Sequence, residues 1–236
     1  MLSRLYNAPL HVVDVGAEAY PEPKPGANAR WARVDVGGTV GNIRDTDAMD
    51  EVALQGSLRA GADAVDALPE ETHLLILGEM GIGNTTPAAA ISARLLQCAA
   101  EVMVGPGTGV EGEALEAKTR LVSAALERTA GSDAPLEVLR RLGGREIAAI
   151  VGAMGRAAER GIAILVDGFI VSSAALVAVR MDERIRDFLW FGHRSAEPGH
   201  ARILEALDAS PLVDAGLRLG EGSGALTSLP LVRAAV

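Results

Sequence analysis

Short apolar stretches alternate with longer stretches of helical periodicity along most of this chain. The apolar stretches are rich in β-branched residues and end in glycine; they are residues 10–16, 73–78, 101–105 and 162–168. Strands that are apolar almost throughout are covered on both faces, and their alternation with helices is typical of a parallel sheet. The sequence therefore predicts an α/β fold with a doubly wound, mainly parallel sheet flanked by helices.

The predicted helices follow the predicted strands. They are expected at residues 86–100, 111–130, 135–161 and 172–181. The C-terminal part, residues 182–236, is expected to form mostly short helices joined at glycines. We therefore divide the chain into an α/β nucleotide-binding core, residues 1–185, and a C-terminal helical and glycine-loop region, residues 186–236, that completes the active site. Residues 20–28 are rich in proline and are interpreted as an exposed loop.

Composition excludes several classes of protein. Aromatic residues make up only 3% of the 236 residues, so the core must be aliphatic, which favours helices packed on a sheet. The net charge is −9 and there is no run of Lys and Arg, which argues against a nucleic-acid partner. The single cysteine, Cys98, excludes an internal disulfide and a cysteine zinc cluster. We expect a cytoplasmic protein.

One segment, residues 161–179, is long and apolar enough to raise the question of a membrane span. Asp167 and Gly168 interrupt its centre, and two serines follow. A buried strand, a tight turn and a buried helix explain the segment more economically, so no membrane association is expected.

The sequence GEMGIGNTT, residues 78–86, follows a predicted strand and precedes a predicted helix. Gly81 and Gly83 would let the backbone approach a ligand, and the free amides of a helix start suit an anion. The carboxylate of Glu79 would accept hydrogen bonds from ribose hydroxyls, whereas it would repel a phosphate. The alternative is a generic tight turn.

Two further turns could bind a ligand in the same way. GPGTG at residues 105–109 comes after a predicted strand, and Lys118 downstream could supply a point charge for phosphate; the alternative is a solvated lysine. At residues 166–169, Asp167 could cap the next turn, or the amide of Gly168 could contact a ligand.

Two motifs in the C-terminal part carry titratable groups. HRSAEPGH, residues 193–200, holds two histidines and a glutamate, but its spacing matches no zinc motif, and a packed, hydrogen-bonded loop is expected instead of a metal site. In LGEGSGAL, residues 219–226, Glu221 stands between glycines in apolar surroundings. Partial desolvation would raise its pKa and suit a general base; the alternative is a glutamate that caps a helix.

Taken together, GEMGIGNTTPAAA, GPGTGV with Lys118, LVDGFI, HRSAEPGH and LGEGSGAL resemble the nicotinate-nucleotide:dimethylbenzimidazole phosphoribosyltransferases of cobalamin biosynthesis, the CobT family. The motifs occur in the family order and extend from about residue 10 to the end. The resemblance implies transfer of phosphoribose from nicotinate mononucleotide to 5,6-dimethylbenzimidazole, giving α-ribazole 5′-phosphate and nicotinate with inversion. It implies no cofactor, no metal and a homodimer.

The resemblance also assigns roles to individual residues. Glu221 resembles the general base that takes the ring N–H proton of the benzimidazole, Leu219 would lie beside that ring, and Glu79 resembles a ribose contact. The residues that resemble phosphate contacts are Gly81, Gly107, Lys118, Gly168 and Ser195.

One departure from the family leaves a second hypothesis open. Family members normally begin well before the position that matches Met1, and their additional segment helps to hold the benzimidazole. The alternative function is therefore a catalytically impaired nucleotide-binding homologue, or a fragment that lacks the benzimidazole pocket. A dehydrogenase of the Rossmann type is excluded, because no G-x-G-x-x-G opens a helix after the first predicted strand.

Overall fold

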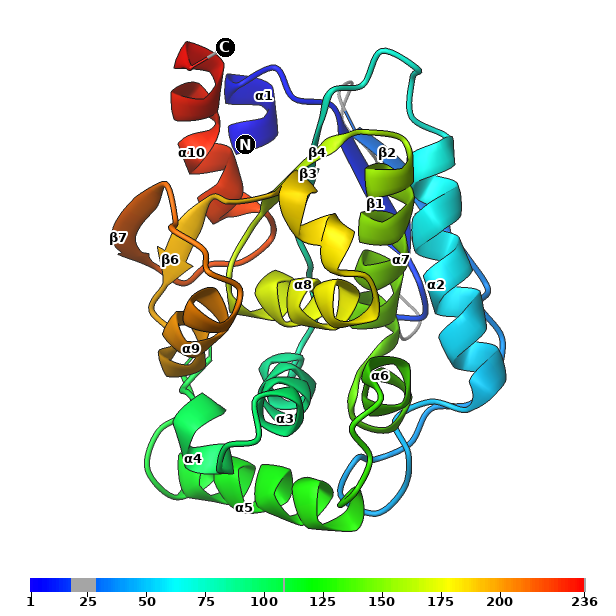
Figure 1. Ribbon diagram of the computed structural model, residues 1–236, viewed down its shortest axis with the longest axis vertical. Helices are drawn as coiled ribbons and strands as arrows, with labels where there is room; N and C mark the ends of the chain where they lie inside the picture. Colours follow the sequence, from blue (N-terminus) through cyan, green and yellow to red (C-terminus); the bar gives the residue numbers. More distant parts are fainter. Residues whose placement is uncertain (18–28, 108, 236) are drawn as a thin grey trace.

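The structure is a computed structural model that describes residues 1–17, 29–107 and 109–235. The predicted proline-rich loop at residues 20–28 lies outside the described residues. Figure 1 shows the chain with the two ends side by side at the top of the view, where α1 (Leu2–Leu5) lies against α10 (Ser223–Ala234). The Arg233 guanidinium donates to the carbonyl oxygen of Tyr6 at 2.8 Å.

The described strands form three small sheets, and every pair of named strands is parallel. Their bounds are β1 (Leu10–Asp14), β2 (Ala29–Arg33), β3 (Leu74–Leu77), β4 (Ala163–Val166), β5 (Leu189–Phe191), β6 (His193–Ser195) and β7 (Val213–Leu217). β1 pairs with β2, β3–β4–β5 form the central sheet in that order, and β6 pairs with β7. The predicted parallel α/β fold is confirmed, but its strands are divided among three sheets.

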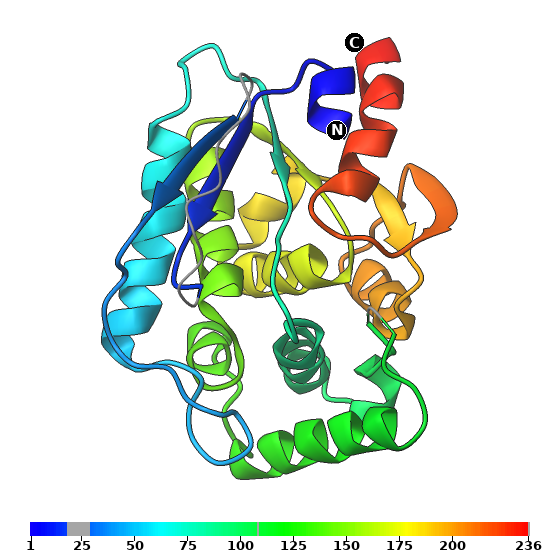
Figure 2. The same cartoon turned by 180° about the vertical axis from the view of Figure 1, so that it is seen from behind.

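Helices surround the central sheet and make up most of the core. They are α1, α2 (Glu51–Asp66), α3 (Thr85–Leu95), α4 (Ala100–Met103), α5 (Glu113–Arg128), α6 (Pro135–Leu142), α7 (Arg145–Glu159), α8 (Phe169–Met181), the 3-10 helix η1 (Glu183–Phe188), α9 (Pro198–Ala206) and α10. α2 packs along α7, and β1 lies against α2 on the same side of the molecule (Figure 2).

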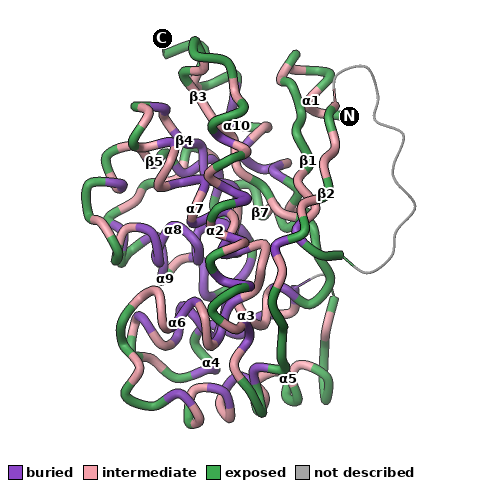
Figure 3. The backbone as a smooth tube through the Cα atoms, turned by 90° about the vertical axis from the view of Figure 1, so that its right-hand side faces the viewer, coloured by how far each residue is buried: buried purple, intermediate pink, exposed green. Residues whose placement is uncertain are grey.

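Helix α8 is the centre of the core. Every residue from Phe169 to Ala178 is buried, because α8 packs against α3, α6, α7 and α9. Figure 3 shows the buried backbone gathered around these helices, whereas β1 and β2 lie at the surface. The apolar segment 161–179 thus forms a strand, a turn and a buried helix, as predicted. Within the described ranges, no helix is both long and apolar enough to cross a membrane.

Two predicted elements were wrong. Residues 101–105 do not form a strand; they belong to helix α4 and the extended turn after it, and α4 packs against α3, α5 and α9. The helix expected at residues 135–161 is two helices, α6 and α7. It breaks at Gly143 and Gly144, whose backbones are extended, and a Cβ at Gly143 would collide with the carbonyl oxygen of Leu139.

The C-terminal part contains more than the short helices that were predicted. Besides η1, α9 and α10 it forms the strands β5, β6 and β7, which are only three to five residues long and leave little periodic signal. β5 pairs with β4, so the central sheet continues across the predicted boundary at residue 185. The division into 1–185 and 186–236 stays a prediction.

Candidate active site

The strands β3 and β4 end at the same edge of the central sheet, where Leu77 lies beside Val166 in the parallel register. Gly78 and Glu79 follow β3, and Asp167 follows β4. In α/β sheets this edge, beyond the carboxyl ends of the strands, is where ligands bind. The candidate site residues inferred from the sequence were expected at this edge for that reason.

Three helices begin at this edge. Helix α3 begins after Asn84, α8 after Gly168 and α10 after Gly222. In none of the three does the side chain of the cap residue accept a hydrogen bond from the first amides of its helix, so these amides need other partners. The positive ends of three helix dipoles favour a negatively charged ligand at this place.

Glu79 and Glu221 are brought together by their backbones, although they are far apart in the sequence. A Cβ at Gly78 would collide with the backbone of Gly222, so the two loops pack main chain to main chain. The N–H of Glu221 donates to the carbonyl oxygen of Glu79 at 3.1 Å. We call residues 219–222 the Glu221 loop.

Glu79 is a partly buried carboxyl with a raised pKa. Burial raises its pKa to about 7, and the nearby charges of Asp167, Glu146 and Glu221 act in the same direction. A hydrogen bond donated by the side-chain amide of Asn84 opposes this shift. Near neutral pH the Glu79 carboxyl can therefore either donate or accept a hydrogen bond, which suits contact with sugar hydroxyls.

Glu221 lies differently from what the sequence suggested. Its residue is exposed, so the expected desolvation is not found. Its backbone is left-handed with φ +59°, between Gly220 at φ +79° and Gly222 at φ +71°. A left-handed conformation is costly for a residue with a side chain, and such strain concentrates at functional sites. The preceding Leu219 is 71% exposed.

Asp167 anchors the end of this loop. It is 1% exposed, and its two oxygens accept the N–H groups of Gly222 at 3.1 Å and Ala225 at 2.8 Å. One interpretation of the sequence was that Asp167 caps the turn after its own strand; instead it caps α10, whose start lies more than fifty residues further along the chain. Glu79, Asp167 and Glu221 together are called the carboxyl end of the site.

Lys118 reaches the site from α5. Its Nζ donates to Thr85 Oγ1 and to the carbonyl oxygen of Gly105, both at 2.8 Å. An ammonium group has three hydrogens, so one remains to be donated to a ligand. Burial lowers the pKa of Lys118, and the charge of Glu197 opposes that shift. Lys118 is thus not the solvated lysine of the alternative interpretation.

Glu197, the glutamate of the HRSAEPGH motif, is a site residue to which the sequence analysis assigned no role. It is 7% exposed, and its Oε1 accepts the N–H of Gly107 at 2.8 Å. Its own N–H donates to Ser195 Oγ at 3.3 Å, which links Ser195 to Gly107. Its Oε2 is buried without a hydrogen-bond partner among the described residues. Gly107, Lys118 and Glu197 are called the lysine end of the site.

The remaining candidates connect the two ends. A Cβ at Gly168 would lie 3.6 Å from the Ser195 Cβ, so these two residues are neighbours. A Cβ at Gly81 would lie 3.2 Å from the amide nitrogen of Asn84, which places Gly81 with the carboxyl end. Gly107, Lys118, Gly168 and Ser195 gather toward the lysine end.

The histidines of the HRSAEPGH motif are buried, but the expected loop was wrong: the motif forms strand β6, a short turn and the start of helix α9. His200 Nε2 lies 2.9 Å from Ser172 Oγ, and its Nδ1 accepts the N–H of Ser195 at 2.8 Å. Burial lowers the pKa of His200 to about 3, so it is neutral at physiological pH. His193 Nε2 lies 3.5 Å from Asp167 Oδ1. The described residues contain no cluster of three or more His, Cys, Asp and Glu side chains fit to hold a metal ion.

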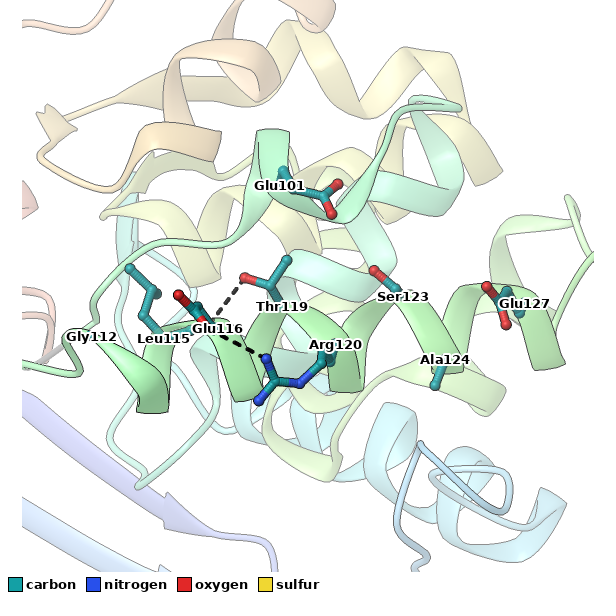
Figure 4. Close-up of a pocket in the computed structure, with 9 residues that line it drawn as sticks. All are labelled: Glu101, Gly112, Leu115, Glu116, Thr119, Arg120, Ser123, Ala124 and Glu127. Atoms are coloured by element: carbon teal, nitrogen blue, oxygen red, sulfur yellow. Dashed lines mark hydrogen bonds and ion pairs between the residues drawn. The ribbon is translucent and has the colours of Figure 1, made fainter.

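A separate pocket of about 770 Å³ lies along α5, outside the candidate site (Figure 4). Its lining residues are Glu101, Gly112, Leu115, Glu116, Thr119, Arg120, Ser123, Ala124 and Glu127. None of the predicted site residues is among them, and its charged side chains belong mainly to the exposed surface of α5.

Fold and site together define an α/β protein with a place for a ligand that is both anionic and rich in hydroxyl groups. Helix starts and Lys118 favour a phosphate, and Glu79 favours a sugar. A nucleotide combines both features.

Comparison with known proteins identifies the family. A family model described as phosphoribosyltransferase matches residues 1–236, and the chain belongs to this family. It is 50% identical to a nicotinate-nucleotide–dimethylbenzimidazole phosphoribosyltransferase of Pseudomonas syringae pv. syringae and 46% identical to one of Xanthomonas axonopodis pv. citri. The alignments cover the whole of this chain but only 66% and 67% of those relatives. The chain thus spans about two thirds of their length.

Solved structures give the same result. The crystal structure of CobT from Thermus thermophilus superposes with a TM-score of 0.88 at 41% identity. The superposition covers 99% of this chain and 69% of that one. A second structure of the enzyme from the same organism, named as nicotinate-nucleotide-dimethylbenzimidazole phosphoribosyltransferase, gives a TM-score of 0.87 at 39% identity and is covered to 68%.

Proposed function

We propose that this protein transfers phosphoribose from nicotinate mononucleotide to 5,6-dimethylbenzimidazole, releasing nicotinate and forming α-ribazole 5′-phosphate. The observation that carries the proposal is the backbone contact between Glu79 and Glu221 at the sheet edge where α3, α8 and α10 begin. It joins a carboxyl suited to the sugar and a carboxyl suited to a general base. The names of the relatives supply the substrates.

In this proposal the lysine end holds the phosphate. The free hydrogen of Lys118 and the amides of Gly107 and Gly168 would donate to phosphate oxygens, as would the hydroxyl of Ser195. Gly81 would contribute from the loop after β3. The N–H of Gly107 already donates to the Glu197 carboxylate. A phosphate can accept from this N–H only if the hydrogen bond to Glu197 is broken.

The carboxyl end performs the transfer. A ring nitrogen of the benzimidazole attacks C1′ of the ribose, and the bond from C1′ to the nicotinate nitrogen breaks with its electron pair going to nicotinate. The Glu221 carboxylate takes the N–H proton of the benzimidazole, and Leu219 lies beside its ring. Glu79 contacts the ribose hydroxyls, and its negative charge when ionised stabilises the cationic character that develops at the sugar.

The second candidate function is nucleotide binding without transfer. It is favoured by the exposure of Glu221 and Leu219, because a general base and a ring contact work best when water is excluded. We also propose that the protein is a homodimer, as the family resemblance implies, and that it is located in the cytoplasm, as its acidic composition leads us to expect.

Nicotinate release from nicotinate mononucleotide, measured with and without 5,6-dimethylbenzimidazole, separates the two functions. The transferase predicts release that depends on the benzimidazole and that Glu221→Gln removes while calorimetry still detects mononucleotide binding. Binding without release by the wild-type chain would support the second function, and neither binding nor release would reject both.

A further inference from the structure

Asp167 is the most deeply buried carboxylate in the described part of the site. It lies at the end of β4, is 1% exposed, and uses both oxygens to accept main-chain N–H groups from the start of α10. These N–H groups, of Gly222 and Ala225, belong to the first turn of a helix and have no partner within it. Asp167 therefore replaces a local helix cap with one supplied by the central sheet.

The Glu221 loop needs such an anchor. Gly220, Glu221 and Gly222 all have left-handed backbones, and a run of this kind persists only where the surroundings hold it. Besides the packing of Gly222 on Gly78 and a 2.9 Å hydrogen bond from the Ser223 N–H to the Gly220 carbonyl oxygen, three hydrogen bonds hold the loop. The N–H of Glu221 donates to the carbonyl oxygen of Glu79, the Ser223 hydroxyl donates to the carbonyl oxygen of Gly220 at 2.6 Å, and Asp167 accepts from Gly222.

Only the Asp167 contact ties the loop to a buried side chain of the central sheet. The Ser223 bond lies within the turn itself, and the Glu79 bond joins one loop to another. We propose that Asp167 is a positioning residue that fixes the Glu221 loop to the end of β4 and so sets the place of the Glu221 carboxyl relative to Glu79. The proposal rests on the proposed role of Glu221 as general base.

The same carboxylate also acts on Glu79 through its charge. The groups that act on the Glu79 carboxyl are Asn84 at the start of α3, Asp167 at the end of β4, Glu146 in the first turn of α7, and Glu221. Burial is the largest cause of the raised pKa of Glu79, and the charge of Asp167 adds to it. Removal of that charge lowers the pKa of Glu79, because the ionised form loses a repulsion.

The test compares Asp167→Asn with the wild-type chain. Asparagine has the same shape, but its NH₂ group would face one of the two N–H donors that the carboxylate accepts. We expect hydrogen exchange at the Gly222 or Ala225 amide to accelerate by about fivefold or more, the factor that corresponds to one lost hydrogen bond. We expect the pKa of Glu79, followed by carbon NMR on labelled glutamate, to fall.

In the transferase reaction, kcat of the variant should decrease while KM for nicotinate mononucleotide stays within about twofold, because the phosphate contacts are untouched. Asp50→Asn is the matched control. Asp50 also caps a helix, α2, and accepts from Ala53 and Thr39, but it belongs to no part of the candidate site. It should alter neither the Glu79 titration nor the Gly222 amide.

Unchanged exchange at both amides together with an unchanged pKa of Glu79 would overturn the proposal. If Asp167→Asn does not fold, exchange in the wild-type chain decides, because unprotected Gly222 and Ala225 amides contradict the anchor directly. Absence of nicotinate release by the wild type would reject the proposed function and leave the exchange and titration results to decide the role of Asp167.

Discussion

At the carboxyl end of the site the buried acceptors are satisfied, whereas at the lysine end they are not. Both oxygens of Asp167 accept N–H groups, whereas Glu197 Oε2 is buried without a hydrogen-bond partner among the described residues. A buried polar group without a partner is costly unless something else supplies one. The carboxyl end is thus preorganised by Asp167, whereas the lysine end keeps one buried acceptor, Glu197 Oε2, that has no partner among the described residues.

The contact between Gly78 and Gly222 offers the most direct way to break the carboxyl end. In Gly78→Ala the added Cβ would collide with the Gly222 backbone and push the two loops apart. We expect a loss of about 3 kcal/mol or more of unfolding free energy, measured by urea denaturation, because neither side of the contact is a flexible side chain.

Gly155→Ala is the matched control for that change. Gly155 lies inside α7, and a Cβ there would meet nothing within 4 Å. The substitution should be neutral or stabilise the protein by up to about 1 kcal/mol through helix propensity. Equal effects of the two substitutions would show that the loops do not depend on close backbone packing.

Lys118→Met tests the lysine end. Methionine keeps the length of the side chain in a half-buried place and removes the donor to Thr85, Gly105 and the proposed phosphate. A charge-assisted hydrogen bond to phosphate corresponds to about a 10- to 100-fold loss of affinity for nicotinate mononucleotide, measured by calorimetry. Arg120→Met, two residues further along α5 at its exposed face, should leave affinity unchanged. If Lys118→Met binds nicotinate mononucleotide as tightly as the wild type, the phosphate does not bind at the lysine end.

The raised pKa of Glu79 predicts a dependence of stability on pH. Glu79 releases its proton at about pH 7 in the folded chain but near its ordinary value of 4.5 when unfolded. The unfolded state therefore binds fewer protons between these values, and stability falls as the pH rises from 4.5 through 7. Glu79→Gln should remove this penalty and stabilise the protein by about 2 kcal/mol at pH 8, with little effect at pH 4.

Thermal unfolding at the two pH values measures the difference, and the exposed Glu70→Gln serves as the control. Two outcomes would contradict the raised pKa of Glu79. Glu70→Gln and Glu79→Gln could stabilise the protein equally, or the stability difference between Glu79→Gln and the wild type could be the same at both pH values.

The comparison also separates what the sequence could predict from what it could not. The ends of β3 and β4 were predictable, because an apolar run followed by glycine is a local signal. The apolar run at residues 101–105 led to a wrong prediction of a strand. Its first residues belong to helix α4, which packs against other helices. Local preference for a strand was overridden there by packing.

The missed site residues depend on contacts across the chain. Glu197 binds the amide of Gly107, ninety residues earlier, and no local pattern indicates that pair. The desolvation expected at Glu221 was wrong, since Glu221 is exposed and the desolvated carboxyl is Glu79. Both stand beside glycines, so their local sequences do not distinguish the buried carboxyl from the exposed one.

The smallest predicted effect isolates strain from chemistry in the Glu221 loop. Glu221→Gly and Glu221→Ala both remove the carboxyl, so neither should release nicotinate. Their stabilities should differ, because glycine adopts φ +59° without strain and alanine does not. We expect the glycine variant to be more stable than the alanine variant by about 1 kcal/mol in urea denaturation. Equal stabilities would mean that the loop relaxes out of the left-handed conformation once the side chain is gone, and that its three anchors do not hold it there.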